Sequence, residues 1–103
     1  MVIGVDFDGV VHDYRHPLPG KKMGGPIEGS KESLLALMEG GHTVIIFTAW
    51  PSSRHRVIKE WMSYYGIPYH NITNVKLPEI ELFIDDKAIT FTSWNELMRG
   101  DLR

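Results

Sequence analysis

The first ten residues constrain this chain most, because an apolar run of strand-forming residues ends there in two carboxylates. Residues 2–5 (VIGV) are followed directly by Asp6-Phe7-Asp8. Side chains of a strand alternate between its two faces, so Asp6 and Asp8 are expected to project the same way. Open α/β sheets place their sites at the carboxyl ends of strands. Two carboxylates this close repel each other unless a cation or a shared proton compensates. The pattern therefore indicates metal binding or acid–base chemistry.

Strand-like and helix-like segments alternate along the rest of the chain. Strands are predicted at residues 2–7, 42–47, 69–72, 81–84 and 89–92, and helices after Ser30 (as N-cap), after Pro51 and after Ser93. Glycine and proline crowd residues 9–27, which are expected to form a loop or a short hairpin. We therefore expect one domain over residues 1–103, a Rossmann-like three-layer α/β/α sandwich with a mainly parallel sheet of about five strands.

Composition excludes several classes of protein. The formal net charge of −2 gives no overall attraction to nucleic acid or to an anionic membrane. The chain has no cysteine, which excludes disulfides and thiolate metal sites and fits a reducing compartment. The apolar stretch Val44–Phe47 is far shorter than a membrane span, and Met1–Val5 is too short for the core of a signal peptide. We expect a cytoplasmic protein that does not contact membranes.

Side chains suited to phosphate and metal chemistry follow four of the predicted segments. These are Asp6 with Asp8, then Thr48, then Lys76, and finally Asp85 with Asp86. A parallel sheet brings the carboxyl ends of its strands to one edge, so the set is expected around one point. Carboxylate oxygens suit a hard cation, and Mg²⁺ in particular when a phosphate completes its coordination. A lysine and a hydroxyl beside it suit phosphate oxygens.

The order of these segments resembles the haloacid dehalogenase-like superfamily of phosphohydrolases. The segment 6–10 (DFDGV) resembles its first motif, and Thr48 at the end of the apolar run 45–47 resembles its second. Lys76 resembles the third motif, and the segment 83–86 (FIDD) resembles the fourth. The likeness spans essentially the whole chain and is greatest to the small bacterial and phage members.

The resemblance implies a role for each catalytic residue. Asp6 would be the nucleophile that forms an aspartyl-phosphate. Asp8 would protonate the leaving oxygen and then activate the hydrolytic water. Thr48 and Lys76 would hold and neutralise the phosphoryl oxygens. Phosphoryl transfer depends mainly on positioning and charge stabilisation, so this small set of groups could suffice.

The resemblance also implies a Mg²⁺ site. Asp85 would hold the ion together with Asp6 and the backbone carbonyl of Asp8, and Asp86 would do so directly or through water. Each residue also has a simpler interpretation. The two early carboxylates could cap a turn, Thr48 could be a strand former, and a lysine in a loop is usually exposed.

The spacing of the motifs leaves no room for a cap domain. Forty positions separate Asp8 from Thr48, and twenty-eight separate Thr48 from Lys76. The predicted loops, helices and strands use all of them. Residues 11–26 would then be the one cover, a short flap over an open site. Either a large substrate or another subunit of a homo-oligomer is expected to close it.

The flap contains a local positive patch, formed by Arg15, Lys21 and Lys22. Such a patch suits a polyanionic substrate such as a nucleotide or a nucleic-acid end, although these charges could simply keep the loop soluble. Trp50 could stack on a substrate ring or serve packing. Arg54 could reach a substrate phosphate or lie exposed in a first helical turn.

Two histidines of the flap, His12 and His16, are four residues apart, which would suit a metal on a helix. Pro17, Pro19 and Gly20 argue against a helix there, so both are expected to be loop histidines.

The sequence therefore predicts a capless, Mg²⁺-dependent phosphatase acting on a phosphomonoester. A non-catalytic Mg²⁺- and phosphate-binding regulatory module, and a phosphotransferase with the same intermediate, remain open alternatives. A phospho-accepting receiver domain uses similar residues, but in it the acidic pair follows the first strand as neighbours. Here the adjacent pair comes last, at residues 85–86.

Overall fold

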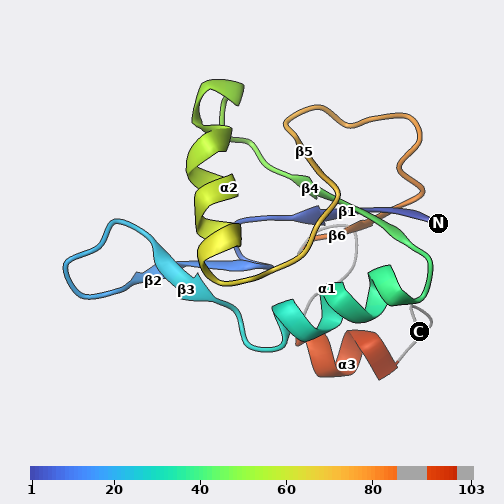
Figure 1. Ribbon diagram of the computed structural model, residues 1–103, viewed down its shortest axis with the longest axis horizontal. Helices are drawn as coiled ribbons and strands as arrows, with labels where there is room; N and C mark the ends of the chain where they lie inside the picture. Colours follow the sequence, from blue (N-terminus) through green and yellow to red (C-terminus); the bar gives the residue numbers. More distant parts are fainter. Residues whose placement is uncertain (86–92, 100–103) are drawn as a thin grey trace.

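The computed structural model describes residues 1–85 and 93–99 and shows a mixed α/β fold (Figure 1). Its main sheet has four parallel strands in the order β5-β4-β1-β6. They are β1 (Val2–Asp6), β4 (Thr43–Phe47), β5 (Asn71–Thr73) and β6 (Leu82–Ile84). The mainly parallel sheet is confirmed. The fifth strand predicted at 89–92 lies outside the described residues.

Two long helices, α1 (Ser30–Glu39) and α2 (His55–Tyr64), follow β1 and β4, and a 3₁₀ turn, η1 (Ser52–Arg54), precedes α2. The short helix α3 (Trp94–Arg99) lies beside α1 (Figure 1). The connections β1–β4 and β4–β5 advance in the same direction across the sheet, so right-handed crossovers place α1 and α2 on one face. A single hydrophobic cluster joins both helices to the strands.

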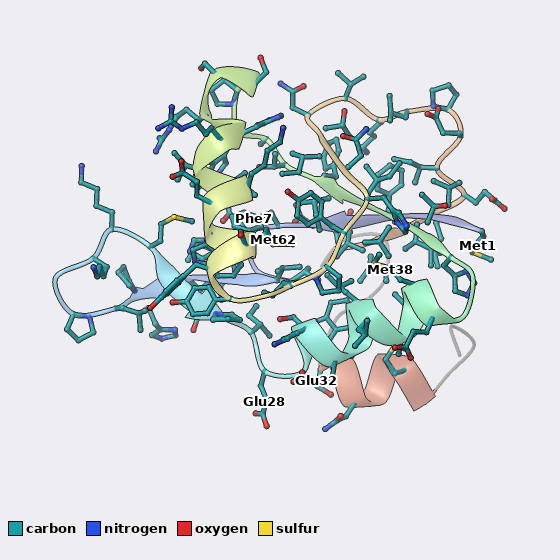
Figure 2. All side chains as sticks on the ribbon, in the orientation of Figure 1. Met1, Phe7, Glu28, Glu32, Met38 and Met62 are labelled. Atoms are coloured by element: carbon teal, nitrogen blue, oxygen red, sulfur yellow. The ribbon has the colours of Figure 1, made fainter. Side chains whose placement is uncertain are left out.

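The core lies where the apolar face of the sheet meets these helices. It contains Val5 of β1, Leu34 of α1 and Ile58 of α2, all with 0% exposure. Figure 2 shows Phe7 and Met62 in this region and Glu28 pointing away from it. Burying side chains of this kind gives roughly 1.5–3 kcal/mol each. The core thus holds β1, whose carboxyl end carries the candidate site, in a fixed position.

On the opposite face of the sheet, the described residues that pack against β1 come from an irregular segment and from β6, not from a helix. A Cβ added to Gly4 would lie 2.8 Å from the Phe83 ring and 3.1 Å from Ile80, so any larger residue would force these side chains to move. Ile80 belongs to the segment 74–81, which has no helix. The helix layer that a three-layer sandwich needs on this face is therefore not confirmed.

The predicted flap is an antiparallel hairpin of β2 (His12–Pro17) and β3 (Gly24–Pro26). This confirms the short hairpin rather than a structureless loop. The prediction of Ser30 as an N-cap is wrong, because α1 begins at Ser30 and Gly29, with φ of 85°, occupies the cap. The Ser30 hydroxyl is buried instead, without a hydrogen-bond partner among the described residues. In the part of the chain that is described, no helix is long and apolar enough to cross a membrane.

Candidate active site

The candidate site lies at the carboxyl end of β1, where the chain connections diverge. β1 pairs with β4 on one side and with β6 on the other. The connection from β1 leads toward β4 and β5, and the chain returns to β6 on the opposite side. Such a topological switch point is where open α/β sheets bind their ligands. The two carboxylates of the first motif therefore stand at the expected position.

Three of the predicted site residues lie at or just beyond the ends of adjacent strands. Asp6 is in register with Phe47, and Phe7 donates its backbone N–H to the Phe47 carbonyl at 3.0 Å. Thr48 follows Phe47 directly. Val5 is in register with Ile84, so Asp85 follows β6 at the level at which Asp6 ends β1. The register thus places Asp6, Thr48 and Asp85 along one edge.

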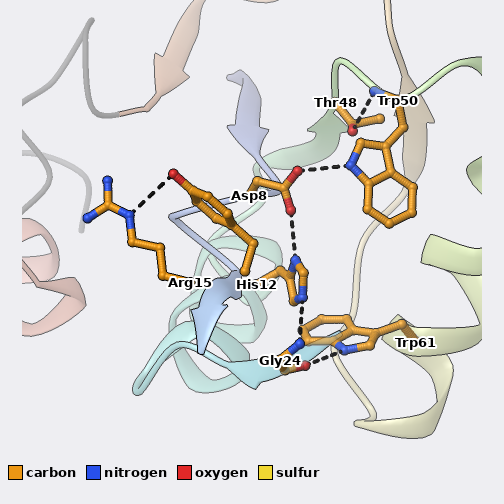
Figure 3. Close-up of polar contacts among 8 residues, drawn as sticks. Asp8, His12, Arg15, Gly24, Thr48, Trp50 and Trp61 are labelled. Carbon is orange, nitrogen blue, oxygen red and sulfur yellow. Dashed lines mark hydrogen bonds and ion pairs between the residues drawn. The ribbon is translucent and has the colours of Figure 1, made fainter. Parts of the chain in front are cut away.

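The carboxylate of Asp8 is held from two sides (Figure 3). Its Oδ1 lies 2.7 Å from Nδ1 of His12, and its Oδ2 accepts a hydrogen bond of 2.9 Å from the indole N–H of Trp50. The Asp8 side chain is 33% exposed, whereas that of His12 is 4% exposed. A partly open carboxylate with both oxygens already oriented is suited to proton transfer.

A tight turn brings Asp8 and His12 together. The N–H groups of Val11 and His12 both donate to the Phe7 carbonyl, at 3.0 and 2.9 Å. Gly9 adopts φ of 87°, a conformation that glycine tolerates best. The chain therefore folds back directly after the first motif, and β2 begins beneath Asp8.

Thr48 shapes the turn that follows β4. Its side chain is buried, with 1% exposure for the residue, and its Oγ1 accepts the backbone N–H of Trp50 at 3.1 Å. Its own N–H donates to the Thr73 carbonyl at 3.0 Å. The hydroxyl hydrogen of Thr48 is not used by these contacts, so it can still be donated to an anionic oxygen.

Trp50 connects several groups beside the site. The guanidinium of Arg54 lies 4.8 Å from the centre of the Trp50 ring, a cation–π arrangement. His55 Nε2 donates to the Trp50 carbonyl at 2.9 Å. Trp50 therefore packs against the core and also has a polar contact through its indole N–H, while stacking on a substrate ring stays a prediction.

Lys76 lies on the exposed segment between β5 and β6. Its Nζ is 5.6 Å from the centre of the Phe83 ring. Phe83 is in register with Gly4, and alternation places Gly4 on the same face as Asp6. With the described residues, Lys76 forms no ion pair within 4.0 Å, so its ammonium is near the sheet edge but not fixed there by a carboxylate.

The donor set for a cation consists of oxygens, which fits the chemistry of Mg²⁺. Among the described residues, no group of three His, Cys, Asp or Glu side chains could hold a metal ion. Mg²⁺ usually needs only one or two carboxylates, with waters and substrate phosphates completing its coordination. Asp6 and Asp85 are two carboxylates at this edge of the sheet, and Asp86 lies outside the described residues.

The prediction that His12 and His16 are loop histidines is wrong, because both lie in β2 (His12–Pro17). His12 is buried, with 3% exposure, whereas the His16 side chain is 79% exposed. The prediction relied on residues that all follow His16, namely Pro17, Pro19 and Gly20, and these carry no information on the segment before His16. The sequence signal for burial of His12 was the apolar pair directly before it, Val10 and Val11.

Comparison with known proteins adds information on the fold. A conserved protein of Bacteroides thetaiotaomicron has a solved structure that is similar to this chain, with a TM-score of 0.74 and 23% sequence identity. The similar region covers 94% of this chain and 85% of that protein. No family model matches the chain, and no similar curated protein was found. At this identity the likeness supports the α/β fold alone.

Proposed function

We propose that this chain is a Mg²⁺-dependent phosphatase of the haloacid dehalogenase-like superfamily, with Asp6 as nucleophile. One observation supports the proposal most: at the switch point the register puts Asp85 at the level of Asp6, with Thr48 one residue beyond that level on the strand to the other side. The oriented carboxylate of Asp8 lies beside them. The five-stranded, three-layer form of the fold and a cytoplasmic location belong to this proposal.

In the first step, a carboxylate oxygen of Asp6 attacks the phosphorus of the substrate, and the bond from phosphorus to the ester oxygen breaks. Asp8 gives its proton to that leaving oxygen. In the second step, Asp8 takes a proton from water, whose oxygen attacks the phosphorus. The bond from phosphorus to Asp6 then breaks, and inorganic phosphate leaves. Thr48 donates a hydrogen bond to a phosphoryl oxygen, and Lys76 supplies a positive charge.

The proposed Mg²⁺ ligands are Asp6, Asp85, the backbone carbonyl of Asp8 and, directly or through water, Asp86. The bound ion would supply positive charge beside the phosphoryl oxygens. The protein's own task there is to keep two carboxylates side by side at the sheet edge, which the pairing of β1 with β6 does.

The substrate is proposed to be a phosphomonoester on a large or polyanionic molecule, such as a nucleotide or a nucleic-acid end. Arg15, Lys21 and Lys22 are exposed on the hairpin, and Arg54 is exposed beside Trp50. Positive charge around an open site favours an anionic substrate. A second subunit covering the site is the alternative that a homo-oligomer would provide.

The strand order argues against the receiver-domain alternative. Counted along the chain, the four parallel strands are arranged third, second, first, fourth. The flavodoxin-like order of receiver domains places the first strand between the second and the third. Here the first strand lies between the second and the fourth, so the phospho-accepting chemistry is proposed for Asp6 and not for a residue after the third strand.

The test is hydrolysis of p-nitrophenyl phosphate by the wild-type protein and by Asp6→Asn, each with Mg²⁺ and with a chelator. We expect phosphate release that requires Mg²⁺ and is lost in Asp6→Asn. Asp13→Asn is the matched control, because Asp13 is a carboxylate of the hairpin paired with His16 at 3.0 Å. It should keep the wild-type rate.

Each contrary result has a defined meaning. An Asp6→Asn protein as active as the wild type would exclude the aspartyl-phosphate mechanism. Binding of Mg²⁺ and inorganic phosphate by a wild type that hydrolyses neither p-nitrophenyl phosphate nor a nucleotide set would favour the regulatory module. Transfer of the phosphoryl group to an added alcohol in preference to water would favour the phosphotransferase.

A further inference from the structure

The hydrogen bonds around His12 determine where its single ring proton lies. The backbone N–H of Gly24 donates to Nε2 of His12 at 3.0 Å. A backbone N–H can only donate, so Nε2 must present its lone pair. A neutral imidazole then carries its proton on Nδ1, which lies 2.7 Å from Oδ1 of Asp8. His12 therefore donates to the carboxylate as the Nδ1–H tautomer.

Aromatic side chains fix the plane of the His12 ring. It stacks on Phe7, with ring centres 5.0 Å apart and an interplanar angle of 18°. It also meets the edge of Trp61 at 5.3 Å and 75°. The indole N–H of Trp61 donates to the Gly24 carbonyl at 3.0 Å. Both backbone groups of Gly24 are thus used, and β3 is fixed against α2 and against His12.

Asp8 therefore receives one donor on each carboxylate oxygen, from two different parts of the chain. His12 comes from the hairpin, and Trp50 comes from the turn after β4 (Figure 3). Two donors on opposite oxygens prevent rotation of the carboxylate. Each oxygen keeps a further lone pair, which can take the proton of the proposed reaction.

We infer that His12 is a positioning residue, which holds the acid–base carboxylate of Asp8 and ties its orientation to the hairpin through Gly24. The inference rests on the proposed function and deepens it. Removing the acceptor at Nε2 releases β3, whereas removing the donor at Nδ1 releases Asp8. The two nitrogen atoms of one ring therefore have separable tasks.

Two substitutions separate these tasks. In His12→Asn the side-chain amide N–H can replace Nδ1–H toward Asp8, but nothing reaches the Gly24 N–H. In His12→Gln the side-chain carbonyl can replace Nε2 toward Gly24, but the donor to Asp8 is lost. We expect His12→Gln to lower kcat by about 10- to 100-fold, since a hydrogen bond to a charged group is lost. His12→Asn should keep most of kcat, and KM should change little in both.

The stability of the two variants should follow the opposite order, with His12→Gln the more stable to urea. A merely structural role would make activity follow stability, so His12→Gln would be the more active protein. That result, or equal kcat values in the two variants, would overturn the inference. His16→Gln is the matched control, because His16 pairs with Asp13 in the same hairpin at 3.0 Å and should leave kcat unchanged.

Nitrogen-15 NMR of histidine-labelled wild type tests the assignment without any turnover. The His12 signals, identified by their loss in His12→Gln, should show a protonated Nδ1 and an unprotonated Nε2. An Nε2–H tautomer or a doubly protonated ring would overturn the hydrogen-bond chain. If wild type hydrolyses neither p-nitrophenyl phosphate nor the nucleotide set, the proposed function fails and the positioning role with it, whatever tautomer is found. If wild type is active and His12→Gln equals it, the positioning role alone fails.

Discussion

The two sides of the candidate site are built in different ways. On the side of Asp8, two ring side chains orient the carboxylate, since the buried His12 and the partly buried Trp50 donate to its two oxygens. On the side of Lys76, an exposed ammonium lies over the Phe83 ring, 5.6 Å from its centre. A proton transfer needs a donor within hydrogen-bond distance and in line. A positive charge acts over a longer range and tolerates movement. The difference therefore matches the two tasks that the proposal assigns.

Among substitutions that compare the two sides of the site, Lys76→Met is expected to have the largest effect. Lys76→Met keeps the length of the side chain and removes its charge. We expect kcat/KM for p-nitrophenyl phosphate to fall by roughly 10²- to 10³-fold, as when a group that stabilises charge in the transition state is removed. The free energy of unfolding should change by less than about 0.5 kcal/mol, because the residue is exposed.

Lys76→Arg sharpens the comparison. If Lys76 acts through charge, the arginine variant should recover most of the activity that Lys76→Met loses, and activity should decline as salt concentration rises. An arginine variant as inactive as Lys76→Met would mean that Lys76 needs a fixed geometry. Lys76 would then resemble Asp8 in depending on precise orientation, and the proposed difference between the two sides of the site would be wrong.

Gly24→Ala is expected to have the next largest effect, because it disrupts the hairpin that holds His12. A Cβ at Gly24 would overlap the backbone carbonyl oxygen of Asp13. We expect the free energy of unfolding to fall by about 1–3 kcal/mol or more, as for other forced overpacking, and kcat to fall with it. Urea unfolding and steady-state kinetics measure both.

The neighbouring glycine is the matched control for this change. A Cβ on Gly25 would meet nothing within 4 Å, so Gly25→Ala should leave kcat and stability close to wild type. Equal activity in Gly24→Ala and Gly25→Ala would show that the hairpin does not influence Asp8.

Trp50→Phe removes the second donor to Asp8 and keeps a ring beneath Arg54. One hydrogen bond to a charged group is lost, so kcat is expected to fall by about tenfold, which corresponds to about 1.4 kcal/mol. Stability should change little, because Trp50 is only partly buried. Steady-state kinetics against p-nitrophenyl phosphate, beside a urea titration, checks both parts. A stability loss as large as the activity loss would mean that Trp50 serves packing.

The strand ends could be predicted from sequence because they depend on local pattern and a general topological rule. Apolar runs that stop at Asp6, before Thr48 and before Asp85 mark the strands, and parallel pairing aligns them. The partner of Asp8 could not be predicted in this way. His12 reaches it through a turn in which two N–H groups share the Phe7 carbonyl, and this contact has no periodic signal.

The same reasoning explains why the covering of the sheet was only partly predicted. Helix periodicity finds α1 and α2, but it does not say which face each one covers. That choice follows from the direction of successive crossovers, which is known only once the strand order β5-β4-β1-β6 is known. The face with Gly4 and Phe83 is covered by the segment 74–81, whose proline and scattered apolar residues form no regular pattern.

Trp61→Phe gives the smallest expected effect on activity and separates the anchor of the hairpin from the anchor of Asp8. The change removes the indole N–H and leaves the Gly24 carbonyl without that partner, which should lower the free energy of unfolding by about 1–2 kcal/mol. His12 still accepts the Gly24 N–H and still donates to Asp8, so kcat should fall less than in Trp50→Phe. Trp61 and Trp50 thus offer the same substitution at the two ends of one network. If Trp61→Phe lowers kcat more than Trp50→Phe does, the position of the hairpin matters more to Asp8 than the donor that touches its carboxylate.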